Sequence, residues 1–99
     1  MSFDASYPWR PIPGAGQNLT IGAASVASTA VGTQTYAVSV SATGNCHVAV
    51  GVAPVALATS LLVKATDPPR LLRVLPGEKV AVIQDAASTG TLNVHEMSH

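Results

Sequence analysis

The stretch TYAVSVSATGNCHVAVGV, residues 35–52, decides the fold class because two alternating segments flank one turn. In residues 35–41 a large apolar side chain occupies every second position, and the same period of two returns in residues 46–52. Successive side chains of a β-strand point to opposite faces, which puts Tyr36 on the same face as the valines of its segment. Thr43-Gly44-Asn45 between the segments is rich in turn formers. The stretch therefore predicts two strands joined by a turn.

The rest of the chain continues this pattern. Valine (13 residues) and threonine (9 residues) are abundant, and both favour strands. Further strands are predicted for residues 18–21, 25–30, 60–64, 70–75, 79–85 and 91–97. Pro76-Gly77 is the clearest turn, because proline presets its second position and glycine accepts positive φ at the third. Short strands and frequent turns predict an all-β domain over residues 17–99, a small antiparallel β-sandwich or jelly-roll-like domain. Only residues 53–62 could instead form a short helical turn.

Residues 1–16 differ from the domain in composition. They contain three prolines, two glycines and three of the four aromatic residues of the chain, Phe3, Tyr7 and Trp9. Proline fixes φ and removes a hydrogen-bond donor, so we expect an extended N-terminal arm. Exposed aromatics are typical of binding hot spots, so the arm is predicted to bind a partner through Phe3, Tyr7, Trp9 and Arg10. The alternative is that its aromatic residues fold back onto their own sandwich.

Charge is scarce and unevenly placed. Only 10% of the residues are charged, against about 25% in a typical domain, and residues 11–63 contain no Asp, Glu, Lys or Arg. A neutral chain without a basic patch is a poor ligand for nucleic acid, and 47% hydrophobic residues argue against disorder. No uninterrupted apolar stretch is long enough for a membrane helix, and residues 1–10 lack the apolar run of a secretory signal. An uncharged surface invites self-association, so we expect a homo-oligomer, with a trimer favoured.

Six of the ten charged residues lie within residues 64–79. Charges on a short edge strand block edge-to-edge pairing, so this cluster is expected to be a solvated edge. The other interpretation is a polar docking patch made by Lys64, Arg70 and Arg73.

The groups that catalysis needs are largely missing. The single cysteine, Cys46, directly precedes His47, and neighbours in a strand point to opposite faces, so the two cannot form a nucleophile–base pair. Cys46 is expected to be a small buried hydrophobe. His95, Glu96 and His99 match a zinc motif by letters, but that motif requires a helix and residues 91–97 are strand-like. We predict no enzyme activity, no cofactor and no metal site.

Four runs of sequence resemble a class of small tailed-bacteriophage virion proteins, namely residues 43–51, 60–65, 76–85 and 90–96. The class includes β-sandwich capsid decoration (cement) proteins. The resemblance covers about residues 18–97, involves mostly turn and core residues, and includes no catalytic position. It implies a protein of the virion that binds the major capsid protein or another virion protein and stabilises the head shell.

Two groups of alternatives remain open. The same resemblance also fits a head-fibre, tail or connector component. From a different class, the domain could be a carbohydrate- or ligand-binding β-sandwich module, with or without a weak metal at His95 and His99. Exposed aromatics grouped near one strand would favour that module, but only Tyr36 lies within the predicted domain.

Overall fold

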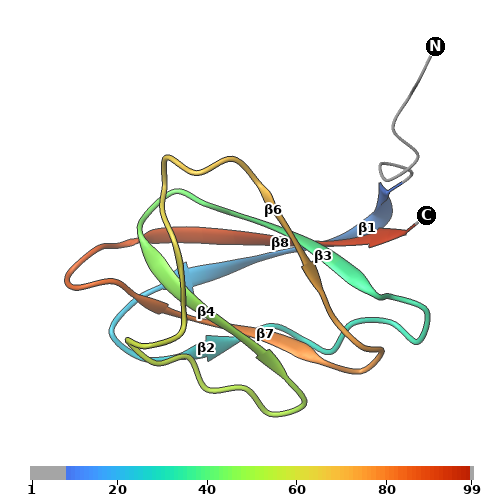
Figure 1. Cartoon of the computed structure of the whole chain (residues 1–99), viewed down its shortest axis with the longest axis horizontal. Coiled ribbons are helices and arrows are strands. Elements are labelled where there is room, and N and C mark those ends of the chain that lie inside the picture. Colours follow the sequence, from blue (N-terminus) through green and yellow to red (C-terminus); the bar gives the residue numbers. More distant parts are fainter. Residues whose placement is uncertain (1–8, 99) are drawn as a thin grey trace.

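The computed structural model describes residues 9–98 and shows two four-stranded antiparallel sheets (Figure 1). In chain order the strands are β1 (Arg10–Ile21), β2 (Val26–Ala27), β3 (Ala37–Ala42), β4 (Cys46–Gly51), β5 (Leu61–Val63), β6 (Arg70–Arg73), β7 (Lys79–Gln84) and β8 (Gly90–Ser98). Sheet A has the order β1-β8-β3-β6, and sheet B has the order β2-β7-β4-β5. The all-β prediction is confirmed. Within the described part of the chain, no helix is long and apolar enough to cross a membrane.

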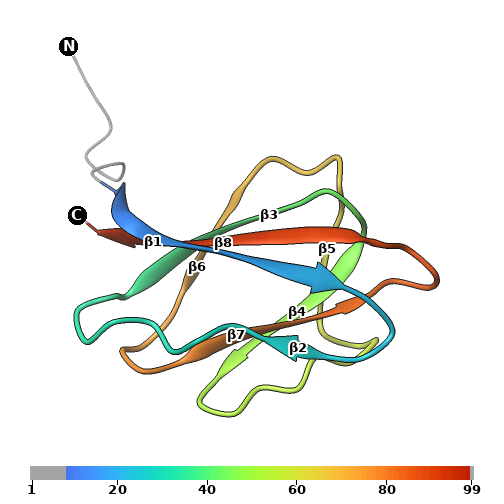
Figure 2. The same ribbon diagram turned by 180° about the vertical axis from the view of Figure 1, so that it is seen from behind.

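The strand pairing is that of a jelly roll. Each strand of the first half pairs antiparallel with one of the second half in reverse order: β1 with β8, β2 with β7, β3 with β6 and β4 with β5. Pairing of β3 with β8 and of β4 with β7 then completes the two sheets. Eight strands in two such sheets are the jelly-roll form of the β-sandwich, and the view from behind shows β1, β8 and β3 of sheet A above β7 and β2 of sheet B (Figure 2). The jelly-roll-like prediction is therefore confirmed.

Alternating valines from both sheets build the core. Val38 and Val40 of β3 face Val80 and Val82 of β7, and all four side chains are fully buried. Burial of a valine side chain contributes roughly 1.5–3 kcal/mol, so a core of small branched residues can still hold a thin sandwich together. The core cluster consists of Leu19, Ile21, Val31, Val38, Val40, Ala42, Cys46, Val48, Val63, Val74, Val80, Val82, Leu92 and Val94.

Two predicted turns lie where they were expected. In the turn at residues 75–78, Gly77 has a φ of 85°, and the Glu78 amide donates to the Leu75 carbonyl at 3.0 Å. The turn at residues 43–45 carries the chain from sheet A to sheet B. There a side chain on Gly44 would collide with the carbonyl of Thr89. Glycine is needed at this position because two connections between the sheets approach each other closely.

The first strand is longer than the sequence suggested. It begins at Arg10, where the prediction began at residue 18. Of the predicted arm, Arg10, Pro11 and Gly16 pair with β8, and the register shifts between Pro11 and Gly16. Proline lacks a donor and is tolerated on an edge strand, and β1 is an edge of sheet A. Phe3 and Tyr7 lie outside the described residues. Residues 53–62 form no helix and make up most of the irregular connection between β4 and β5.

Candidate functional site

The outer face of sheet A carries no charge along most of its length. In β1, β3 and β8, alternation with the buried core residues turns seven mostly small and polar side chains outward, namely Asn18, Thr20, Ser39, Ser41, Thr91, Asn93 and His95. At the β6 edge the same alternation turns Leu71 and Arg73 outward. The amide of Asn93 donates to the Asn18 side-chain oxygen at 3.0 Å across β8 and β1. The imidazole of His95 lies over Gly16, where an added Cβ would stand 2.8 Å from its Cδ2. The result is a face of small, mostly polar side chains.

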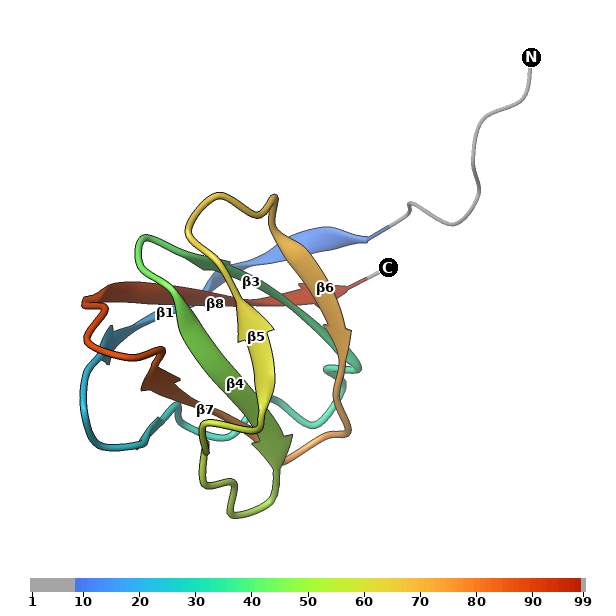
Figure 3. The same ribbon diagram turned by 60° about the vertical axis from the view of Figure 1, so that its left-hand side comes forward.

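The connection between β4 and β5, together with the first residue of β5, exposes four aliphatic side chains, which we call the β4–β5 surface: Val52, Val55, Leu57 and Leu61. Their exposed fractions are 75%, 64%, 57% and 43%. Ala56 within the same segment is buried, and its amide donates to the hydroxyl of Ser25 at 2.9 Å. The connection projects beyond both strands (Figure 3). This segment therefore packs against the domain through its middle and presents apolar side chains on either side.

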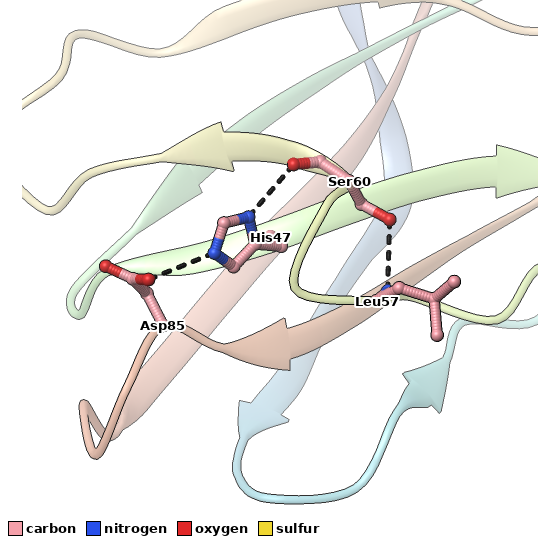
Figure 4. A network of polar contacts seen from close by, with 4 residues as sticks. All are labelled: His47, Leu57, Ser60 and Asp85. Carbon is pink, nitrogen blue, oxygen red and sulfur yellow. Dashed lines mark hydrogen bonds and ion pairs between the residues drawn. The ribbon is translucent and has the colours of Figure 1, made fainter.

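A buried histidine fixes the end of this connection (Figure 4). The Nδ1 atom of His47 lies 2.9 Å from the Ser60 carbonyl oxygen, and its Nε2 atom lies 3.0 Å from Oδ1 of Asp85. The Ser60 hydroxyl in turn accepts the Leu57 amide at 3.0 Å. A carbonyl and a carboxylate only accept, so both contacts are hydrogen bonds when both ring nitrogens carry a proton, which is the imidazolium form of His47.

The electrostatics of His47 agree with this geometry. The hydrogen bond to the Ser60 carbonyl raises the pKa of His47 above its usual value, Asp85 raises it further, and burial opposes both. The His47 side chain is 11% exposed and that of Asp85 is 41% exposed. His47 therefore joins β4, the end of β7 and the β4–β5 connection through one charged group, in a structural role.

The other reactive side chains are separated from one another. Cys46 is fully buried in the core, as expected, while His47 points out of the opposite side of β4. Burial, with a smaller effect of Asp85, raises the pKa of the Cys46 thiol to about 11. Glu96 accepts hydrogen bonds from the Gly32 amide and the Thr35 hydroxyl, so it braces a loop. Within residues 9–98, no three His, Cys, Asp or Glu side chains group together as a metal site would require.

Trp9 and Tyr36 form the walls of a groove at the end of sheet A where β1 begins. On one side they enclose about 390 Å³ with four residues of β3 and β6, namely Ala37, Leu71, Leu72 and Arg73. On the other side they enclose about 340 Å³ with Gln34, Met97 and Ser98. We call these nine residues the aromatic groove. Trp9 is half-buried and Tyr36 is 50% exposed.

The groove was not predicted from the sequence, because the alternation of residues 35–41 placed Tyr36 on the same face as Val38 and Val40. The structure begins β3 at Ala37, so Tyr36 precedes the strand and escapes its alternation. Its own carbonyl accepts the Val74 amide at 3.0 Å, which ties it to the end of β6. Of the predicted arm residues, Trp9 thus lies against its own domain, and Arg10 is exposed and pairs with Ser98 as the first residue of β1.

The three basic residues proposed as a docking patch do not form one cluster. Asp67 accepts the Lys64 amide at 3.0 Å and lies 3.5 Å from the Arg70 guanidinium, so these residues surround one turn. Arg73 lies at the opposite end of β6 and lines the aromatic groove. As expected of a charged edge, β6 is the short outer strand of sheet A.

Comparison of the chain with models of protein families, with curated proteins and with solved structures gave no match. The residues and geometry of the chain itself therefore carry the functional inference.

Proposed function

We propose that this chain is a structural protein of the virion of a tailed bacteriophage, a capsid decoration protein that binds the head shell and stabilises it. In this role it acts as a homo-oligomer, with a trimer favoured, and its partners are its own copies and the major capsid protein. The observation that carries the proposal is the β4–β5 surface. Three aliphatic side chains of one connection and a fourth at the start of β5 are exposed on a chain that has only ten charged residues.

Large apolar side chains that several residues of one segment expose are typical of interaction sites in soluble proteins. This surface is also held in place before any partner binds, because Ser60 at its end accepts from His47 and Ala56 in its middle donates to Ser25. A preordered loop loses little conformational freedom on association. Contact between identical copies is the commonest way to bury such a surface, so we assign the β4–β5 surface to the contact between protomers.

The outer face of sheet A suits the contact with the shell. Its small side chains let another protein approach closely, and Asn18 and Asn93 offer hydrogen bonds without a charge that would have to be desolvated. Jelly rolls also form the domains of many viral capsids. That likeness is one of architecture alone and serves here only as analogy. The proposed role requires no catalytic group.

The contact between protomers is tested by light scattering on the purified chain. We expect an oligomer, and we expect the double variant Val55→Asp, Leu57→Asp to be a folded monomer because a charge within an apolar contact must be desolvated. Thr59→Asp is the matched control, since Thr59 is exposed on the same connection but is not part of the aliphatic set. A wild-type chain that stays monomeric at high concentration would remove the basis of the proposal.

Binding to the shell is tested by particle incorporation. A tagged chain expressed during infection by the phage that encodes it should sediment with heads, and a chain lacking residues 1–8 should fold but incorporate poorly. The truncation stops at residue 8 because residues 10–16 belong to β1. A variant with Phe3 and Tyr7 both changed to alanine separates the aromatic side chains from the length of the arm. Labelling of fibres, tails or connectors in electron micrographs would reassign the chain to those structures.

A further inference from the structure

We propose that the aromatic groove is a saccharide-binding site, in which Trp9 and Tyr36 contact the apolar face of a sugar ring while Gln34 and Arg73 bond its hydroxyl groups. This activity is separate from the two proposed contacts, which are the contact between protomers through the β4–β5 surface and the contact with the shell through the outer face of sheet A.

The pairing of the two aromatic side chains is the first reason. The chain has only four aromatic residues, and the structure brings two of them from distant positions to the walls of one groove. Its floor includes Ala37, which is 2% exposed. Small-ligand sites are lined mainly by aromatic and apolar side chains with a few polar groups that orient the ligand. A sugar ring matches such a lining, because it presents an apolar C–H face and a rim of hydroxyls.

The polar residues lie where that rim would be. Arg73 stands on one side of the aromatic pair, and Gln34 and Ser98 stand on the other. Guanidinium and amide groups offer several donors in a plane, and the amide and hydroxyl also accept. Among the lining residues within the described range 9–98 there is no carboxylate, and Arg73 is the one ion. The groove is therefore suited to neutral saccharides and to those that carry a carboxylate.

The walls are fixed independently of any ligand. Oε1 of Glu96 accepts the Gly32 amide at 2.9 Å and the Thr35 hydroxyl at 2.6 Å, which holds the loop that leads into Tyr36. The Tyr36 carbonyl is bonded to Val74. Arg10, the neighbour of Trp9, pairs with Ser98 at the end of β8. Binding to such a preformed site does not have to pay for ordering the loop.

The size of the groove favours more than one sugar unit. The two hollows of about 390 Å³ and 340 Å³ meet at Trp9 and Tyr36, and each falls within the range of about 300–1,000 Å³ that is typical of ligand sites. An oligosaccharide can place neighbouring rings in the two hollows. A proline-rich peptide is another ligand of aromatic grooves, but the polar residues on both sides of the aromatic pair match hydroxyl groups better than proline rings.

The fluorescence of Trp9 tests the proposal directly, because Trp9 is the only tryptophan in the chain. We expect a saturable change of its emission on titration with at least one of cellohexaose, maltohexaose and chitohexaose. Tyr36→Ala should weaken that binding by roughly fivefold to a hundredfold, which is the loss that removal of an aromatic stacking contact causes with nucleic-acid bases. Tyr36→Phe should retain most of it. Leu75→Ala is the matched control, because Leu75 is 52% exposed and lies outside the groove.

Three results would overturn the proposal. The first is that none of the three oligosaccharides changes the Trp9 emission or shifts the backbone amide resonances of residues 34–37 and 71–73. The second is equal saccharide binding by wild type and by a folded Tyr36→Ala variant, which would place the sugar elsewhere. The third is a combination of observations. The Trp9 emission changes when the protein alone is diluted, and the protein binds a synthetic peptide of residues 1–13 but binds no saccharide. That result would assign the groove to the arm of a second copy.

Discussion

Replacement of Asp85 by asparagine should change the stability of this domain in opposite directions at low and at high pH. Asp85 accepts from His47, whose other ring nitrogen donates to the Ser60 carbonyl. The folded pKa of His47 is raised above its unfolded value of 6.5. The stability that this group contributes is therefore fully present below pH 6.5 and is lost as the pH rises through the folded pKa. Asparagine has nearly the same shape but no charge, so it isolates the ionic part of the contact.

The expected size follows from the two hydrogen bonds. A bond to a charged partner contributes about 1.5–3 kcal/mol and a neutral one about 1 kcal/mol. The Asp85 side chain is 41% exposed, and solvent screening puts the loss at the low end, about 1 kcal/mol in the acidic range. At high pH we expect neutral His47 to carry its one proton on Nδ1, which then donates to the Ser60 carbonyl. The lone pair of Nε2 then faces the Asp85 carboxylate, which cannot donate a hydrogen bond to it. An asparagine amide can donate to Nε2, so the variant should match or exceed the wild type there.

Thermal unfolding followed by circular dichroism between about pH 5.5 and pH 9 measures the effect, because histidine titrates in this range. A difference of about 1 kcal/mol moves the melting temperature of a domain this small by roughly 4–8 °C. Asp67→Asn is the control, because the partner of Asp67 is Arg70, whose charge does not change over this pH range. The difference in melting temperature between this variant and the wild type should therefore be the same at every pH. A difference between wild type and Asp85→Asn that does not vary with pH would refute the assignment of His47 as a cation.

Two further predictions concern the turn at residues 43–45 and the core. Gly44→Ala should destabilise the domain by roughly 1–3 kcal/mol, because the added methyl group collides with the Thr89 carbonyl. Gly22→Ala is the control, because its methyl group meets no atom and should destabilise the domain far less. Urea unfolding measures the free energy of unfolding of both variants. The Cys46 thiol, fully buried with its pKa raised to about 11, should react with a disulfide reagent only when the domain unfolds. Fast reaction of the native protein would show that β4 opens locally.

The strands could be predicted from the sequence because their signals are local. Period-two alternation located β3 and β4, and Pro76-Gly77 located the turn before β7. The alternation of apolar residues gave the wrong strand ends, because it continues in the sequence beyond the last residue that pairs with a neighbouring strand. Val52 continues the pattern of β4 but is 75% exposed, because β4 ends at Gly51. The start of β1 was missed for the opposite reason, since prolines hide a strand that pairs along one edge only.

The candidate sites depend on distant contacts, and no local pattern contains them. The Asp85 partner of His47 is separated from it by 38 positions, and Glu96 reaches Thr35 across 61. Each partner comes from the other half of the chain, as reversed pairing of the two halves requires. The aromatic groove arises in the same way from the start of β1, the loop before β3 and the end of β6. The one sequence feature that pointed to the groove was an aromatic residue, Tyr36, at the start of a predicted strand. The alternation of that strand assigned Tyr36 to the same face as Val38 and Val40 instead.

The jelly-roll topology also distributes residues 11–63, which contain no Asp, Glu, Lys or Arg, over both sheets. Residues 11–63 supply β1 and β3 to sheet A, and β2, β4 and β5 to sheet B, so a charge-free segment does not by itself make a charge-free face. Sheet A has such a face over β3, β8 and residues 16–21 of β1, because β8 turns its single charged residue, Glu96, toward Gly32 and Thr35, and Arg73 lies at the β6 edge of the sheet. A lysine in place of Asn93 would put a charge in the middle of that face at little cost to the fold. If the face contacts the shell, this one substitution should reduce incorporation into particles while the β4–β5 surface still forms the oligomer.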